Sequence, residues 1–117
     1  MVRVLVTVTP RMYRQAIALS VQRRRQGLDV RIASPEATER KLADFRPHLL
    51  IHNDNDGLAP VAVADILCRI EVLYSDSMDA RISADGEHST ASDMCMEDLL
   101  RVVDRATALA ERETDQS

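Results

Sequence analysis

Two groups of oxygen-bearing side chains in this 117-residue chain have types and spacing that could do chemistry. The first group is acidic: Asp54 and Asp56 lie in the polar segment 53–57, and Asp76 follows a later apolar segment. If the strands before them end at one sheet edge, the three carboxylates could hold a divalent cation. The same residue types also build turns, because their side chains hydrogen bond to the local backbone. We therefore expect turns here rather than a metal site, and no cofactor.

The second group could bind a small molecule or a nucleotide. Its members each follow a predicted strand: Thr9, Asn53, Asp54 and Ser75. Ligands of open α/β sheets bind beside the carboxyl ends of the strands. The helix predicted after Thr9, with Arg11 and Arg14 near its start, could also attract an anion to its free N–H groups. No glycine lies there to let a phosphate approach the backbone, so an ordinary helix start is the favoured interpretation.

Alternating strand and helix patterns must position these residues. The predicted strands are 4–8, 29–33, 48–52 and 70–74, and the predicted helices are 10–26, 34–45 and 96–112. The first strand is an almost continuous run of β-branched residues, which is typical of a parallel strand covered on both faces. Strands that alternate with helices in this way indicate right-handed βαβ units and a parallel sheet. Residues 58–67 contain Pro60 and predict only a short helix or an irregular segment.

Local signals mark the ends of several elements. Thr9 and Pro10 are predicted to cap and begin the first helix, since proline suits the first helical position, and Gly27 is expected to stop it. Cys95 precedes the last helix, with Asp98 three residues later as in a capping box. These signals support helices at both ends of the chain.

The segment 79–91 departs from the strand and helix alternation. Residues 79–84 alternate with period two, Asp85-Gly86 is a strong type I′ hairpin signal, and 87–91 is polar and compatible with a strand. We therefore predict a flavodoxin-like, three-layer α/β sandwich whose mainly parallel sheet carries an antiparallel hairpin extension at one edge. Residues 1–112 are expected to form one domain, with a frayed tail at 113–117.

Two sequence segments point to a family. The approach to the third strand reads Arg46-Pro47-His48-Leu49-Leu50-Ile51, and the last helix begins Met96-Glu97-Asp98-Leu99-Leu100. Together with the strand and helix alternation, they resemble the receiver domain of bacterial response regulators over residues 1–67 and 94–110. In that family, two acidic residues after strand one and an aspartate ending strand three hold Mg²⁺ and accept a phosphoryl group. A Ser or Thr after strand four and a Lys after strand five complete the switch.

This chain departs from the receiver pattern where the chemistry would take place. The matching positions hold Thr7, Thr9 and Pro10 after the first strand, Asn53 after the third, Ser75 or Tyr74 after the fourth, and the segment 92–94 before the last helix. An amide cannot accept a phosphoryl group, and the segment 92–94 contains no lysine. The resemblance therefore implies a degenerate receiver, or pseudo-receiver, that works without phosphorylation.

Composition narrows the possible partners. A net charge of −4 and a short basic run at 23–25 do not provide the extended basic face of a nucleic-acid-binding domain, so we do not expect nucleic acid as a partner. The apolar N-terminal segment is too short for a signal peptide or a membrane span, which predicts a cytoplasmic protein without a membrane partner. Cys68 and Cys95 are expected to be free thiols.

The remaining reactive side chains favour a binding role over catalysis. His48 and His52 would be about 13 Å apart on one strand, too far to share a metal, and no serine lies in a Gly-x-Ser-x-Gly motif. We expect a non-catalytic regulatory or protein-interaction module that forms a homodimer. The alternative is a small-ligand or nucleotide-binding domain at the carboxyl edge of the sheet. A third, less favoured hypothesis is metal-dependent phosphotransfer with Asp54 as the acceptor.

Overall fold

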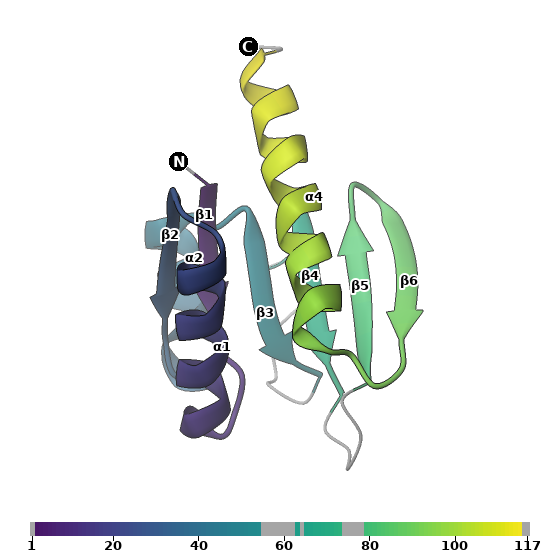
Figure 1. Cartoon of the computed structure of the whole chain (residues 1–117). Coiled ribbons are helices and arrows are strands. Elements are labelled where there is room, and N and C mark those ends of the chain that lie inside the picture. Colours follow the sequence, from purple (N-terminus) through teal and green to yellow (C-terminus); the bar gives the residue numbers. More distant parts are fainter. Residues whose placement is uncertain (1, 55–62, 64, 74–78, 116–117) are drawn as a thin grey trace.

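Residues 2–54, 63, 65–73 and 79–115 are described by the structure, which is a computed structural model. In this part of the chain, one six-stranded sheet forms the centre, with the order β2-β1-β3-β4-β5-β6 (Figure 1). In chain order the elements are β1 (Val2–Val6), α1 (Arg11–Arg24), β2 (Leu28–Ile32), the 3₁₀ turn η1 (Pro35–Ala37), α2 (Thr38–Phe45), β3 (Leu49–Asn53), β4 (Cys68–Val72), β5 (Ala80–Ala84), β6 (Glu87–Ala91) and α4 (Met96–Asp115).

The sheet has a parallel part and an antiparallel part. Strand β1 runs parallel to its neighbours β2 and β3, and β3 runs parallel to β4. Strand β5 is antiparallel to both β4 and β6. This arrangement confirms the predicted α/β fold with its antiparallel hairpin at one edge. The order 2-1-3-4 in the parallel part is flavodoxin-like, and its topological switch point lies between β1 and β3.

Helices cover both faces of the parallel part, giving three layers (Figure 1). Side chains alternate between the two faces along each strand. On β1, Val4 and Val6 join the large apolar cluster under α1 and α4, whereas Leu5 joins the smaller cluster that contains Leu42 of α2. All three β1 side chains are fully buried, which explains why the sequence of this strand is apolar without interruption.

The hairpin has its apolar side chains on one face. Ile70 of β4 and both Ala80 and Ala84 of β5 belong to the cluster under α4. The turn between β5 and β6 is formed by Asp85 (φ 51°) and Gly86 (φ 83°), so both central residues have the positive φ that a type I′ turn requires. The predicted hairpin, including its turn residues, is therefore confirmed.

The predicted start of the first helix was wrong by one residue. Helix α1 begins at Arg11, and Pro10 occupies the N-cap position without a side-chain hydrogen bond. Thr9 is not the cap, because its hydroxyl donates to Asn53 instead. The helix ends at Arg24, two residues before the predicted end, and Gly27 follows with φ 82°.

Other boundaries also differ from the predictions. Pro35–Ala37 forms a 3₁₀ turn, so α2 begins only at Thr38. Strand β4 begins at Cys68, two residues earlier than predicted, because the fully buried Cys68 pairs with Leu49 of β3. Helix α4 begins at Met96 as predicted and extends to Asp115, so the helix continues into the segment expected to fray. The segment 58–67 lies largely outside the described residues.

The two cysteines and the start of α4 were also predicted from the sequence. Cys68 and Cys95 are both free thiols, as predicted. The Cys95 backbone N–H donates to Asp98 Oδ2 (3.2 Å), which is the contact expected from a capping box. Among the described residues, no helix is both long and apolar enough to span a membrane.

Candidate functional site

Asn53 lies at the end of β3, beside the topological switch point of the sheet. Its Oδ1 accepts two hydrogen bonds from Thr9, one from the backbone N–H (2.6 Å) and one from the hydroxyl (3.0 Å). Its Nδ2 donates to the carbonyl oxygen of Val72 at the end of β4 (3.4 Å). The Asn53 side chain therefore links the loop after β1 to the end of β4, and the residue is only 3% exposed.

These contacts require an amide, which both accepts and donates. An ionised carboxylate in its place could still accept from Thr9, but it could not donate to Val72 and would place negative charge against a carbonyl oxygen. In open α/β sheets, ligands occupy the crevice at the switch point. Here the Asn53 side chain spans that position through hydrogen bonds within the protein.

Arg14 brings positive charge to the same edge. It is 9% exposed, and its Nε donates to the carbonyl oxygen of Val8 (3.1 Å), directly before Thr9. Arg14 is part of the core because α1 turns this side chain back toward the loop after β1. A guanidinium beside this loop opposes a divalent cation, because like charges repel strongly in a partly buried site. Arg11, the other predicted anion contact, is exposed.

The predicted ligand-binding residues are only partly brought together. Thr9 and Asn53 are in direct contact, and Asp54 follows with its backbone N–H donating to Val72 (3.1 Å). Ser75 lies outside the described residues, as do Asp56 and Asp76 of the predicted cation site. Within the described ranges, no group of three His, Cys, Asp or Glu residues could hold a metal ion.

Two histidines belong to the β3 region of the sheet. His48 Nδ1 accepts a hydrogen bond from the backbone N–H of Arg3 (3.0 Å), which ties the start of β3 to β1. His52 is buried, and in the register of β1 and β3 it follows the pair formed by Val6 and Ile51.

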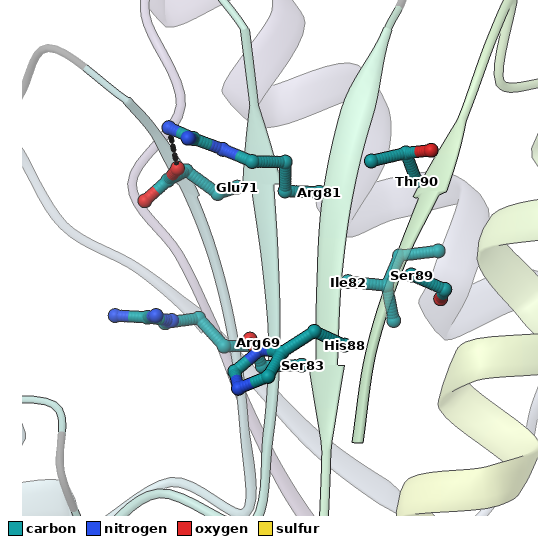
Figure 2. Close-up of a pocket in the computed structure, with 8 residues that line it drawn as sticks. All are labelled: Arg69, Glu71, Arg81, Ile82, Ser83, His88, Ser89 and Thr90. Carbon is teal, nitrogen blue, oxygen red and sulfur yellow. Dashed lines mark hydrogen bonds and ion pairs between the residues drawn. The ribbon is translucent and has the colours of Figure 1, made fainter. Parts of the chain in front are cut away.

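A second candidate region lies on the face of β4, β5 and β6 opposite the α4 cluster. A depression of about 550 Å³ is lined there by residues of all three strands: Arg69, Glu71, Arg81, Ile82, Ser83, His88, Ser89 and Thr90 (Figure 2). Strand register places six of their side chains on one face, because Arg69 pairs with Ser83, which pairs with His88, and Glu71 pairs with Arg81, which pairs with Thr90.

The polar groups of this depression are partly joined to one another. Arg81 forms an ion pair with Glu71 across the β4 and β5 strands (Figure 2). Ser83 Oγ and His88 Nδ1 are hydrogen bonded at 2.9 Å. The side chain of Arg69 has no hydrogen bond or ion pair within the described residues. One guanidinium therefore remains available for a ligand.

A serine bonded to a histidine can also belong to a nucleophilic site. Such a site needs N–H donors directed at an oxyanion. The backbone of β5, which carries Ser83, is engaged in the sheet between β4 and β6. The Ser83 and His88 pair therefore suits binding better than acyl transfer.

Sequence reasoning predicted the hairpin but not this depression. A two-residue turn at Asp85-Gly86 fixes the register, so the pairs of Ser83 with His88 and Arg81 with Thr90 could have been deduced. The contribution of Arg69 could not, because the pairing of β4 with β5 depends on tertiary structure. Comparison of the chain with protein-family models, curated proteins and solved structures gave no match.

Proposed function

We propose that this chain is a non-catalytic regulatory or protein-interaction module of the pseudo-receiver type. One observation carries the proposal: Asn53, at the position of the receiver phospho-acceptor, uses its amide to connect Thr9 with Val72. The strand order 2-1-3-4 and the helices on both faces support a receiver-like frame. The antiparallel β5 departs from an all-parallel arrangement and gives the module a different sheet edge.

The edge strand β6 supports homodimer formation. In a two-residue hairpin the residues that flank the turn exchange backbone hydrogen bonds, so His88 and Thr90 direct their backbone groups away from β5. Antiparallel pairing with a second β6, centred on Ser89, would place His88 opposite Thr90 and Glu87 opposite Ala91. No like charges would face each other across this pairing, and unpaired edges are natural templates for strand addition.

The outer face of α1 is a second surface that suits a protein partner. Its apolar side chains are unusually exposed: Met12 is 74% exposed, Tyr13 56% and Leu19 47%. Met12 and Leu19 are seven residues apart and share one side of the helix. Grouped exposed apolar residues of this kind mark interaction sites more often than isolated ones do.

Sedimentation analysis over a range of concentrations tests the dimer. We expect a dimer for the native chain and a monomer for Thr90→Pro, because proline removes the outward N–H without removing a bond to β5. Thr90→Val keeps that N–H and serves as the matched control, so it should remain dimeric. A native chain that stays monomeric at high concentration would contradict the homodimer. Dimerisation that survives Thr90→Pro and is lost in Leu19→Glu would assign the interface to α1 instead.

The alternative function is a small-ligand or nucleotide-binding domain at the carboxyl edge, using Thr9, Asn53, Asp54 and Ser75. Thermal unfolding with added nucleotides separates the two functions, because a ligand that binds the native state raises the apparent stability. If Asn53 has only a structural role and no ligand binds at this edge, any rise in the unfolding midpoint should be the same for the native chain and for Asp54→Ala. A rise that is lost in Asp54→Ala would favour the carboxyl-edge site.

A further inference from the structure

We infer that the depression on β4, β5 and β6 binds a small phosphate ester, with Arg69, Ser83 and His88 as the phosphate-binding row. These three residues come from three adjacent strands and are paired directly across the sheet. Adjacent strands lie about 4.8 Å apart, so the row spans about 10 Å from β4 to β6. That width suits an oxyanion held between the outer side chains above the central Ser83 hydroxyl.

The distribution of charge favours an anion. The depression contains two arginines and one carboxylate, and that carboxylate, Glu71, is paired with Arg81. Arg69 is half-buried and its guanidinium has no protein partner within the described residues. On a chain with net charge −4, an uncompensated guanidinium inside a concave surface is a position for an anionic ligand. The planar fork of arginine can bind a phosphate through two parallel hydrogen bonds.

The other members of the row add hydrogen-bonding groups at fixed positions. The hydrogen bond between Ser83 Oγ and His88 Nδ1 orients both side chains before any ligand arrives. Thr90 adds a hydroxyl from the neighbouring row, next to Arg81. Groups that are oriented in advance lose less conformational entropy on binding, which strengthens affinity.

A second depression indicates what the phosphate is attached to. Arg69, Ser83 and His88 also line a smaller hollow of about 240 Å³, whose other described walls include Val63, Ile66 and Leu67. The same row therefore borders two spaces: one whose other walls are mostly polar residues, and one whose other walls include the aliphatic side chains of Val63, Ile66 and Leu67. A ligand with a phosphate over the row and a ring or other apolar group beside it would use both spaces. The larger depression, at about 550 Å³, lies within the range of about 300 to 1,000 Å³ that is typical of small-molecule sites. The smaller hollow, at about 240 Å³, adds room for a side group of the ligand.

Phenyl phosphate is a minimal probe with both parts, and inorganic phosphate and phenol carry one part each. We expect phenyl phosphate, titrated at constant ionic strength, to shift the backbone amide NMR signals of Arg69, Ser83 and His88. Inorganic phosphate should shift the same signals more weakly, and phenol should leave them in place. Stronger binding of phenyl phosphate than of inorganic phosphate would show that the phenyl ring occupies the smaller hollow beside Val63, Ile66 and Leu67.

Variants at the row make the test specific. Arg69→Gln should weaken phenyl phosphate binding about tenfold or more, since a charge-assisted hydrogen bond contributes about 1.5–3 kcal/mol. His88→Gln changes an exposed residue and should weaken binding without affecting the fold. Arg23→Gln removes an exposed arginine from α1 and is the charge-matched control, with no expected effect. The inference is overturned if no localised shifts occur, or if Arg69→Gln and Arg23→Gln bind equally well.

Discussion

One sheet contains both the parallel strands β1 and β3 and the hairpin strands β5 and β6. The two pairs differ in how far their faces are buried. On β1, Val4, Leu5 and Val6 are all fully buried, because α1 and α4 cover one face and α2 covers the other. On β6, by contrast, the first four residues are exposed. Burial on both faces is therefore a property of the parallel half, whereas β6 presents polar groups to solvent.

Strand β4 lies at the boundary between these two halves and combines both environments. Cys68 and Ile70 point into the core under α4 and are fully buried, whereas the alternate residues Arg69 and Glu71 line the polar depression. Alternation along one strand thus supplies the core and the candidate binding site at once. Substitutions on the two faces should have separable effects on folding and on binding.

The largest difference is expected from truncating core residues. Leu50→Ala and Ile51→Ala should each lower the free energy of unfolding by about 2–5 kcal/mol, because each leaves a cavity in a fully buried strand. Thr90→Ala in the hairpin should change it by less than about 0.5 kcal/mol, as exposed positions usually do. Chemical denaturation measures all three. Equal losses in the two halves would remove the contrast between them.

Asn53→Ala should have the next largest effect. It removes the acceptor for Thr9 and the donor to Val72 in a buried position, so we expect a loss of about 1–3 kcal/mol in unfolding free energy. Thr9→Val removes only the hydroxyl and should cost less, because the Thr9 backbone N–H still donates to Asn53. If Asn53→Ala were as stable as the native chain, the side chain would have no structural role at this edge.

The two thiols provide a smaller but sharper contrast. Burial raises the pKa of Cys68 to about 11, so at pH 8 it is almost entirely the unreactive thiol, whereas Cys95 is exposed. A thiol-specific reagent should therefore modify one cysteine quickly in the folded protein and the second only after denaturation. Cys95→Ser should abolish the fast phase. Rapid modification of Cys68 in the native protein would mean that the covered face of β4 opens readily.

The smallest effect is expected where helices α1 and α4 are joined at the surface. Arg25 donates two hydrogen bonds to Asp104, at 2.7 and 3.0 Å, and these bonds lower the pKa of Asp104. The carboxylate is then favoured in the folded state, so the pair stabilises the fold above the pKa of the unfolded carboxyl, about 4. This contribution is lost as the pH falls through the folded value.

Thermal unfolding of Asp104→Asn tests that assignment. The variant should unfold at a slightly lower temperature than the native chain near neutral pH. The difference should vanish in strong acid, where Asp104 is protonated and therefore uncharged, like the asparagine that replaces it. The effect should be small because exposed ion pairs contribute little. A difference that persisted in acid would have to come from packing rather than from charge.

The sequence predicted the architecture well because its strongest signals are local. The β-branched run of β1, the helix stop at Gly27 and the Asp85-Gly86 turn each act through nearby backbone geometry, and together they led to the correct element order. Boundaries shifted where tertiary contacts decided them. Thr9 looked like a helix cap in isolation, but its hydroxyl has a partner 44 residues away in Asn53.

The candidate sites were less predictable than the fold for the same reason. Thr9 and Asn53 were expected at one edge from the parallel order alone, and they do meet, although as a structural contact. To predict the proposed phosphate-binding row, both the β5–β6 register and the β4–β5 register would have to be known. The two-residue turn fixes the pairing of Ser83 with His88, whereas the pairing of Arg69 with Ser83 depends on how β4 meets β5 in the tertiary structure.

The most direct test of the central claim, that Asn53 closes the carboxyl edge without phosphorylation, uses Asn53→Asp with a small phosphodonor and Mg²⁺. We predict that neither the native chain nor the variant gains the mass of a phosphoryl group. The variant should also unfold at a lower temperature, because a carboxylate cannot donate to Val72. A Mg²⁺-dependent phosphoryl adduct on Asn53→Asp, or one on the native chain that is lost in Asp54→Ala, would contradict the account.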